Sequence, residues 1–283
     1  MTEQLIEANG VELCVETFGD PADAPILLVM GMGASMLWWE EGFCRLLADG
    51  GRFVIRYDHR DTGRSMAYEP GRPEYSSAEL IGDVARILDG YGIGAGHVAG
   101  TSMGGAIAQL FALEFPRRVA SLVLMSTSPA EPVDRELPGM TQDYERFLGD
   151  SEIDWTDPAA VVDYVTADSR ALSGDRPFDE DAIRERATRD VERARNFASA
   201  QNHGLLADAE GGRERLHSIG APTLVIHGTA DPLFPVEHGQ ALAAEIPGAR
   251  LITLEGAGHI LDPADWETVV EAILEHTNAQ RAP

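Results

Sequence analysis

The stretch HVAGTSMGGA, residues 97–106, passes from small and β-branched residues through Gly100, Ser102 and Gly104 into an alanine-rich helical pattern. A sharp strand-to-helix turn presents a serine hydroxyl at the edge of a sheet only when the backbone is strained, and the residues two positions away must then be very small. Gly100 and Gly104 occupy those positions. The helix that follows would direct its free N–H groups at an oxyanion beside Ser102. The pattern therefore predicts Ser102 as a nucleophile, against the alternative of a structural tight turn.

Short apolar runs recur on both sides of this stretch and are typical of parallel strands buried on both faces. Helical patterns separate them, and residues 4–19 alternate about Asn9-Gly10, a pair that favours a hairpin turn. This alternation predicts an α/β fold with a mostly parallel sheet, helices on both faces and an antiparallel start. The expected strands span residues 26–30, 53–57, 97–100, 119–125, 222–228 and 249–256, and the expected helices 36–48, 77–91, 103–115, 236–245 and 264–276.

One segment, residues 129–217, breaks the alternation. It contains several helical stretches rich in Asp, Glu and Arg and no convincing strand. We therefore expect a core domain formed by residues 1–128 and 218–283 and an inserted helical cap formed by 129–217. The aromatic residues of this cap are expected to offer an apolar pocket for a bulky substrate group; they are Tyr144, Phe147, Trp155, Tyr164, Phe178 and Phe197.

The charge composition narrows the classes of function. The chain has 47 acidic and 22 basic residues, a net charge of −25, which disfavours nucleic acid and anionic membranes as partners. It contains no lysine, so Schiff-base and pyridoxal-type chemistry are excluded. No apolar run is long enough to cross a bilayer, and the first residues lack a secretory pattern, so a cytoplasmic location is expected. Cys14 and Cys44 lie in expected core segments and are interpreted as small buried hydrophobes.

A serine nucleophile needs a histidine base and an acid that orients it. With this type of turn the chain order is serine, acid, histidine, each on a loop after a strand. His259 in LEGAGHI and Asp231 in HGTADPLFP satisfy that order. Asp134 is the alternative acid, whereas Asp262 is expected to cap the last helix. Of the other histidines, His59, His97, His227 and His276 are interpreted as structural.

The oxyanion formed during such a reaction requires two backbone donors. The residue after the nucleophile, Met103, supplies one, and the glycine-bearing loop VMGMGAS supplies the other, which we assign to Met32. Trp38 and Trp39 follow that loop and are expected to line the near side of the substrate site, with the alternative that at least one of them packs in the core. No cluster of His, Cys or carboxylates has a metal-ligand spacing, so neither a metal nor another cofactor is expected.

The motifs together resemble those of the α/β-hydrolase family: GTSMG, VMGMG, and Asp231 and His259 in turn, across residues 1–128 and 218–283. The string YDHRDTGRS at 57–65 is similar to the aclacinomycin methyl esterase branch, whose members cleave a methyl ester on an anthracycline aglycone. The resemblance implies a serine hydrolase that cleaves a carboxylic ester, including the methyl ester of a bulky aromatic polyketide-like molecule, through an acyl-enzyme. It does not extend convincingly through 129–217, the segment expected to select the substrate.

Other activities fit the same three residues. A serine at position 102 argues against haloalkane dehalogenases and epoxide hydrolases, which need a carboxylate nucleophile. Lactone hydrolysis, C–C bond hydrolysis and cofactor-free perhydrolase activity remain open. A ligand-binding receptor with a silent triad is the alternative outside enzymology.

Overall fold

The computed structural model describes residues 3–130, 136–151, 153–206 and 216–278. Within these ranges the chain forms an eight-stranded sheet in the order β1-β2-β4-β3-β5-β6-β7-β8. The pairings from β4 to β8 are parallel, whereas β1 and β2 form an antiparallel hairpin and β2 pairs antiparallel with β4. The predicted mostly parallel sheet with an antiparallel start is confirmed. The strands are β1 (Gln4–Ala8), β2 (Val11–Phe18), β3 (Ala24–Val29), β4 (Arg52–Tyr57), β5 (Gly96–Thr101), β6 (Val119–Met125), β7 (Thr223–Gly228) and β8 (Arg250–Leu254).

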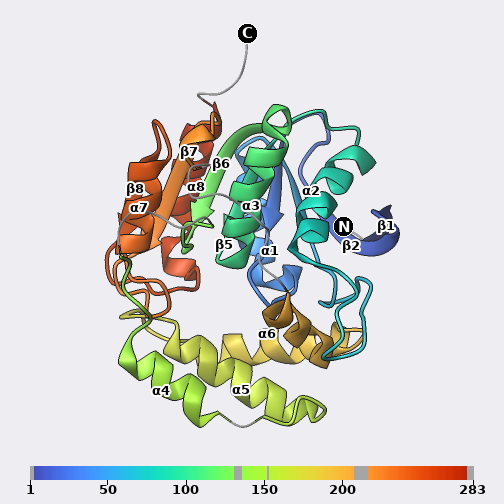
Figure 1. The fold of residues 1–283 in the computed structure, drawn as a ribbon, viewed down its shortest axis with the longest axis vertical. Coiled ribbons are helices and arrows are strands. Elements are labelled where there is room, and N and C mark those ends of the chain that lie inside the picture. The colour runs from blue at the N-terminus through green and yellow to red at the C-terminus, as the bar shows by residue number, and fades with distance from the viewer. Residues whose placement is uncertain (1–2, 131–135, 152, 207–215, 279–283) are drawn as a thin grey trace.

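Helices cover both faces of the sheet (Figure 1). Along β3, Ile26 and Leu28 join one apolar cluster, and Leu27 and Val29 join the other, because successive side chains of a strand point to opposite faces. This double burial explains why β3 is apolar throughout. The helices of the first cluster are α1 (Glu41–Asp49) and α8 (Trp266–Asn278), and those of the second are α2 (Ser77–Gly90), α3 (Met103–Glu114) and α7 (Glu237–Glu245).

Two expected helices are each divided into a 3-10 turn and an α-helix. The expected helix at 36–48 forms η1 (Met36–Trp38) and then α1, and the one at 264–276 forms η5 (Pro263–Asp265) and then α8. The first interruption falls at Trp39, whose ψ of 86° is not helical. The apolar spacing continues across such a break, so the sequence pattern alone did not reveal it.

A group of helices comes between β6 and β7 in the sequence and is seen below the sheet in Figure 1. Each of the three α-helices begins at a side-chain cap, because Thr141, Asp157 and Asp179 accept an N–H group of the first turn. The elements are α4 (Gln142–Asp150), α5 (Pro158–Ala171), α6 (Glu180–Arg193) and η3 (Phe197–Leu205). They adjoin the edge at which the parallel strands end, where the site residues lie.

Candidate active site

Ser102 occupies the turn between β5 and α3, with φ 53° and ψ −125°. A positive φ in a residue that carries a Cβ atom costs about 1–3 kcal/mol and persists only where the surroundings enforce it. Two contacts do so: the Ser102 N–H donates to Met125 O at 3.1 Å, and Thr127 Oγ1 donates to Ser102 O at 2.7 Å. The strained strand-to-helix turn that the sequence predicted is present.

The glycines around Ser102 allow the helix to approach the sheet closely. A Cβ atom on Gly100 would lie 2.2 Å from Gly104 O, and one on Gly104 would lie 2.2 Å from Val29 O. Both distances are far below a van der Waals contact. The start of α3 therefore lies against β3 and β5 at a separation that only glycine permits.

His259 follows β8, and its Nδ1 lies 2.8 Å from Asp231 Oδ2. The other carboxylate oxygen, Asp231 Oδ1, accepts the N–H groups of Leu233 and Phe234, each at 2.9 Å. Burial raises the pKa of Asp231, but the adjacent His259 and the hydrogen bonds outweigh burial and hold that pKa below its ordinary value. An ionised Asp231 only accepts hydrogen bonds, so Nδ1 of His259 carries the proton and Nε2 is left as the basic atom.

Ser102 and His259 are not joined by a hydrogen bond in the described part of the chain. Such bonds are often long in unliganded enzymes and shorten around a bound substrate. The structure thus brings Asp231 and His259 together, while the nucleophilic role of Ser102 stays a prediction. Asp134, the alternative acid, lies outside the described residues, and Asp262 caps η5 by accepting the Ala264 N–H at 2.8 Å.

His227, interpreted from the sequence as structural, lies directly behind Asp231. Its Nε2 is 2.7 Å from Phe234 O and 3.5 Å from Asp231 Oδ2, and the side chain is fully buried. The ring therefore supports both the acid and the turn that binds it. The spacing of four residues between His227 and Asp231, at the end of β7, was the signal in the sequence that could have suggested this contact.

The two assigned oxyanion donors belong to two segments that adjoin Ser102. Met103 is the first residue of α3, and the loop that carries Met32 contacts the serine, because a Cβ atom on Gly31 would lie 3.2 Å from Ser102 Cβ. Among the residues that the structure describes, neither the Met32 N–H nor the Met103 N–H donates to a protein acceptor. Two free donors beside a nucleophile are what an oxyanion hole requires.

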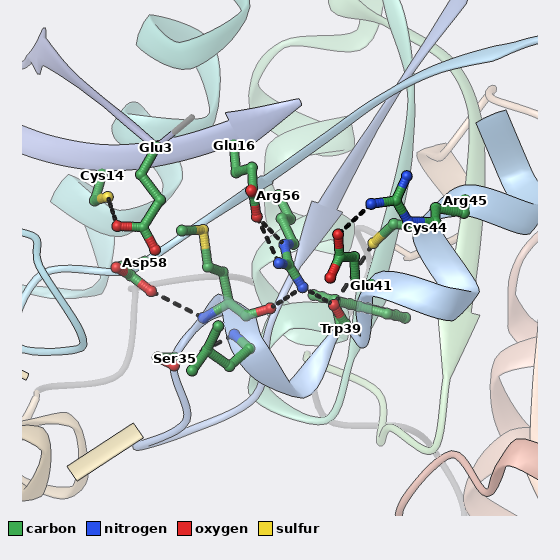
Figure 2. A network of polar contacts seen from close by, with 12 residues as sticks. Glu3, Cys14, Glu16, Ser35, Trp39, Glu41, Cys44, Arg45, Arg56 and Asp58 are labelled. Carbon is green, nitrogen blue, oxygen red and sulfur yellow. Dashed lines mark hydrogen bonds and ion pairs between the residues drawn. The ribbon is translucent and has the colours of Figure 1, made fainter. Parts of the chain in front are cut away.

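The segment after the loop of Met32 is anchored to the end of β4 by polar contacts, as Figure 2 shows. Asp58 Oδ1 accepts the Met36 N–H at 2.9 Å, and Arg56 donates to the carbonyl oxygens of Met36 and Trp39. Trp39 is only 2% exposed, and its ring stacks on Phe43 with centroids 5.7 Å apart. The expectation that Trp39 lines the substrate site is therefore wrong, and the alternative that one tryptophan of the pair packs in the core applies to it.

Trp38 is partly exposed and points toward α6. Its Nε1 donates to Asp190 Oδ2 at 2.9 Å, and the Arg186 guanidinium lies 5.1 Å from its ring centroid. The side chain thus connects the loop after β3 with the helical group. Its contact with a substrate stays a prediction.

Four of the aromatic residues between β6 and β7 pack on one another between α4 and α5. Phe147 stacks with Tyr144 and with Tyr164 at centroid distances of 6.0 and 5.8 Å, and Trp155 meets Tyr164 edge-on at 5.4 Å. Tyr144 also donates its hydroxyl to Asp168 Oδ1 at 2.9 Å. This row forms an apolar centre within the helical group, which the spacing of the aromatics did not reveal.

The end of α5 is attached to the loop that carries His259. The His259 N–H donates to Leu172 O at 2.8 Å, and the Asp175 N–H donates to Gly256 O at 2.9 Å. A Cβ atom on Gly258 would lie 2.1 Å from the same Leu172 carbonyl. The helical group therefore contacts the histidine loop through its backbone.

In the described ranges no three His, Cys, Asp or Glu side chains are grouped as a metal site would require. No helix in those ranges has the length and apolarity needed to span a bilayer.

Comparison with known families gives a match over most of the chain. The model of the alpha/beta hydrolase fold family matches residues 24–261. Two curated proteins are each 35% identical and are covered, like this chain, over 99% of their length. They are rhodomycin D methylesterase DauP of Streptomyces sp. strain C5 and rhodomycin D methylesterase DnrP of Streptomyces peucetius.

Solved structures show the same fold at lower identity. A meta-cleavage product hydrolase from Pseudomonas fluorescens IP01 superposes with a TM-score of 0.78 at 20% identity, covering 98% of this chain and 97% of that one. This similarity concerns the arrangement of strands and helices.

Proposed function

The chain belongs to the α/β-hydrolase family, and from this premise we propose that it is a carboxylic ester hydrolase acting through Ser102, His259 and Asp231. One observation carries the proposal: the strained Ser102 lies at the β5–α3 turn of the same sheet edge where an ionised Asp231 binds Nδ1 of His259. A serine hydroxyl is a weak nucleophile unless such a base removes its proton.

In the proposed reaction Ser102 Oγ adds to the ester carbonyl carbon while its proton passes to His259 Nε2. The electron pair of the C=O bond moves to oxygen, and the oxyanion accepts the N–H groups of Met32 and Met103. The intermediate then expels the alcohol, which takes the proton from His259, and leaves an acyl-serine. Water adds to this acyl group with His259 again as the base, releasing the acid and free Ser102.

We propose the methyl ester of a bulky aromatic polyketide as the substrate class. The full-length similarity to two rhodomycin D methylesterases supports this class of small molecule. The partly exposed Phe234 also supports it, because its ring centroid lies 5.6 Å from that of His259 and offers an aromatic surface beside the base.

We also propose that residues 129–217 act as a cap on a core domain formed by 1–128 and 218–283. The hydrogen bond between the His259 N–H and Leu172 O supports a cap that contacts the catalytic loop directly. The two cysteines, Cys14 and Cys44, are buried and unpaired, which agrees with the reducing cytoplasm in which we place the enzyme.

The test is hydrolysis of rhodomycin D and of 4-nitrophenyl acetate, with the acid product identified by mass spectrometry. Ser102→Ala, Asp231→Ala and His259→Ala should each lower kcat by on the order of 10³ or more. Ser218→Ala, at an exposed serine of η4 (Leu216–Ser218), should have wild-type activity. Full turnover by folded His259→Ala would refute the assignment of the base, and ligand binding without turnover would identify a receptor.

A further inference from the structure

The loop that carries the assigned oxyanion donor Met32 is held by two buried histidines. His59 Nε2 lies 2.9 Å from Met30 O, and the Gly33 N–H donates to His203 Nδ1 at 3.0 Å. Each histidine is at most 3% exposed. His59 follows β4 in the core, whereas His203 belongs to η3 in the helical group, so the two rings reach the loop from different parts of the chain.

The partners fix the protonation of both rings. His203 Nε2 lies 2.8 Å from the Arg60 carbonyl oxygen, which can only accept, so Nε2 carries the proton and Nδ1 offers a lone pair to Gly33. His59 likewise donates from Nε2 to Met30 O. Burial lowers the pKa of His203, against the opposing effects of its hydrogen bond to the Arg60 carbonyl and of Asp61, and burial together with His203 lowers the pKa of His59 to about 3. Both rings are therefore neutral near pH 7, the form that these hydrogen bonds require.

The two bonds restrain the peptide units on either side of the one that carries the Met32 N–H. His59 restrains the Met30–Gly31 peptide unit by binding the Met30 carbonyl oxygen. His203 restrains the Met32–Gly33 peptide unit by accepting the Gly33 N–H. Without them Gly31 and Gly33, the latter with φ 70°, would leave this loop many alternative conformations. The unit between them, Gly31–Met32, is then left with its N–H unpaired beside Ser102.

We propose that His59 and His203 are positioning residues that orient the Met32 N–H toward the oxyanion; the proposal rests on the esterase function proposed above. Neither ring touches the reacting atoms in this scheme. The element that carries His203 is itself tied to the core, because Asn202 Nδ2 donates to Asp61 Oδ2 at 2.9 Å and Ser199 Oγ donates to Tyr68 O at 2.6 Å. The helical group thus contributes a fixed support for the oxyanion hole.

The two histidines use different ring nitrogens, and this permits a crossed test with amide side chains. The amide of Asn ends near the position of Nδ1, and that of Gln reaches the position of Nε2. At position 203 Asn should therefore retain the bond to Gly33 and Gln should lose it, whereas at position 59 Gln should retain the bond to Met30 and Asn should lose it.

We expect His203→Asn and His59→Gln to keep kcat within about threefold of wild type. His203→Gln and His59→Asn should lower kcat by about 10- to 100-fold with KM nearly unchanged, somewhat less than removal of an oxyanion donor. The affinity of a trifluoromethyl ketone, which forms an oxyanion on Ser102, should fall by the same factor. The affinity of the carboxylic acid product should not change.

His276→Ala is the matched control, because His276 is a buried histidine on α8 whose Nε2 lies 3.1 Å from Leu122 O, in a different part of the core. It should lower the thermal unfolding midpoint without lowering kcat. Equal kcat in all four amide variants, or a loss of kcat that follows the unfolding midpoint alone, would overturn the positioning role. If the wild-type protein lacks Ser102-dependent esterase activity, the proposed function fails first, and the positioning role fails with it.

Discussion

The strain at Ser102 is possible only because its neighbours are very small. The turn has no room for a Cβ atom at Gly104, where it would lie 2.2 Å from Val29 O and 2.5 Å from Met30 O. Both atoms belong to the backbone, so relief requires a shift of α3 or of β3. Such a shift would move the serine and the loop of Met32 together, since Met30 belongs to that loop.

Replacement of Gly104 by Ala should therefore lower both stability and activity. We expect the free energy of unfolding to fall by about 1–3 kcal/mol, the usual cost of overpacking, and kcat to fall at least tenfold. Urea unfolding and ester hydrolysis measure the two effects. Gly149→Ala in α4 is the control, because a Cβ atom there meets nothing within 4 Å and alanine is the better helix former. Wild-type kcat in the Gly104→Ala protein would show that the turn tolerates a side chain.

At the scale of secondary structure elements, α6 is fastened to the core by two buried carboxylates. Asp190 on α6 accepts a hydrogen bond from the indole N–H of Trp38, and Arg193 on α6 donates to Asp58 Oδ2 at 2.7 Å. The pKa of Asp190 is raised to about 6, mainly by burial and to a smaller extent by Asp58, against the lowering effects of the hydrogen bonds with Ser35 and Trp38 and of the Arg193 charge. Because the folded protein binds this proton more tightly than the unfolded chain, the contribution to stability is present below about pH 4 and is lost as pH rises through about 6.

Asp190→Asn should remove this pH dependence. The amide oxygen of Asn can still accept the hydrogen bond from the indole N–H of Trp38, but the side chain carries no charge. The variant should therefore be more stable than wild type at pH 7 by about 1–3 kcal/mol. The difference between the two proteins should shrink toward pH 4.5, as measured by urea unfolding at each pH. Asp163→Asn, at an exposed carboxylate paired with Arg184, should show no such trend. A constant difference across this range would place the pKa of Asp190 near its ordinary value.

The elements of the core follow from sequence periodicity, whereas several contacts at the site do not. GTSMG predicts the strained turn because the geometry is local, and the order of Asp231 and His259 follows from the chain. The roles of His203 and Asp190 depend on how the helices between β6 and β7 meet the core, and that segment has no period that fixes its orientation. Trp38 and Trp39 are adjacent and alike, so only packing on Phe43 decides which of them is buried.

On the scale of the whole molecule, every side-chain cation apart from histidine is a guanidinium, and acids outnumber these arginines by 47 to 22. Two largely buried arginines bind carboxylates in specific geometry: Arg60 holds Asp83 through two bonds of 2.7 and 2.8 Å, and Arg193 holds Asp58. A planar guanidinium suits such bidentate contacts better than an ammonium group does. The net charge of −25 is not balanced by arginine, and the surplus acidic side chains repel one another across the surface.

Added salt should therefore stabilise the protein. Screening weakens both the repulsion among surplus acids and the exposed ion pairs, such as Arg45 with Glu41, but an exposed pair contributes only about 0–1 kcal/mol. Buried pairs such as Arg60 with Asp83 are screened far less. With a net charge of −25 the relief of repulsion should prevail, and the thermal unfolding midpoint should rise with sodium chloride at pH 7. The rise should level off by roughly 0.5 M, where the Debye length is already about half its value at 0.1 M. A rise that continued linearly beyond that point and was larger with sulfate would indicate exclusion of salt from the surface instead, and a fall would mean that ion pairs outweigh the repulsion.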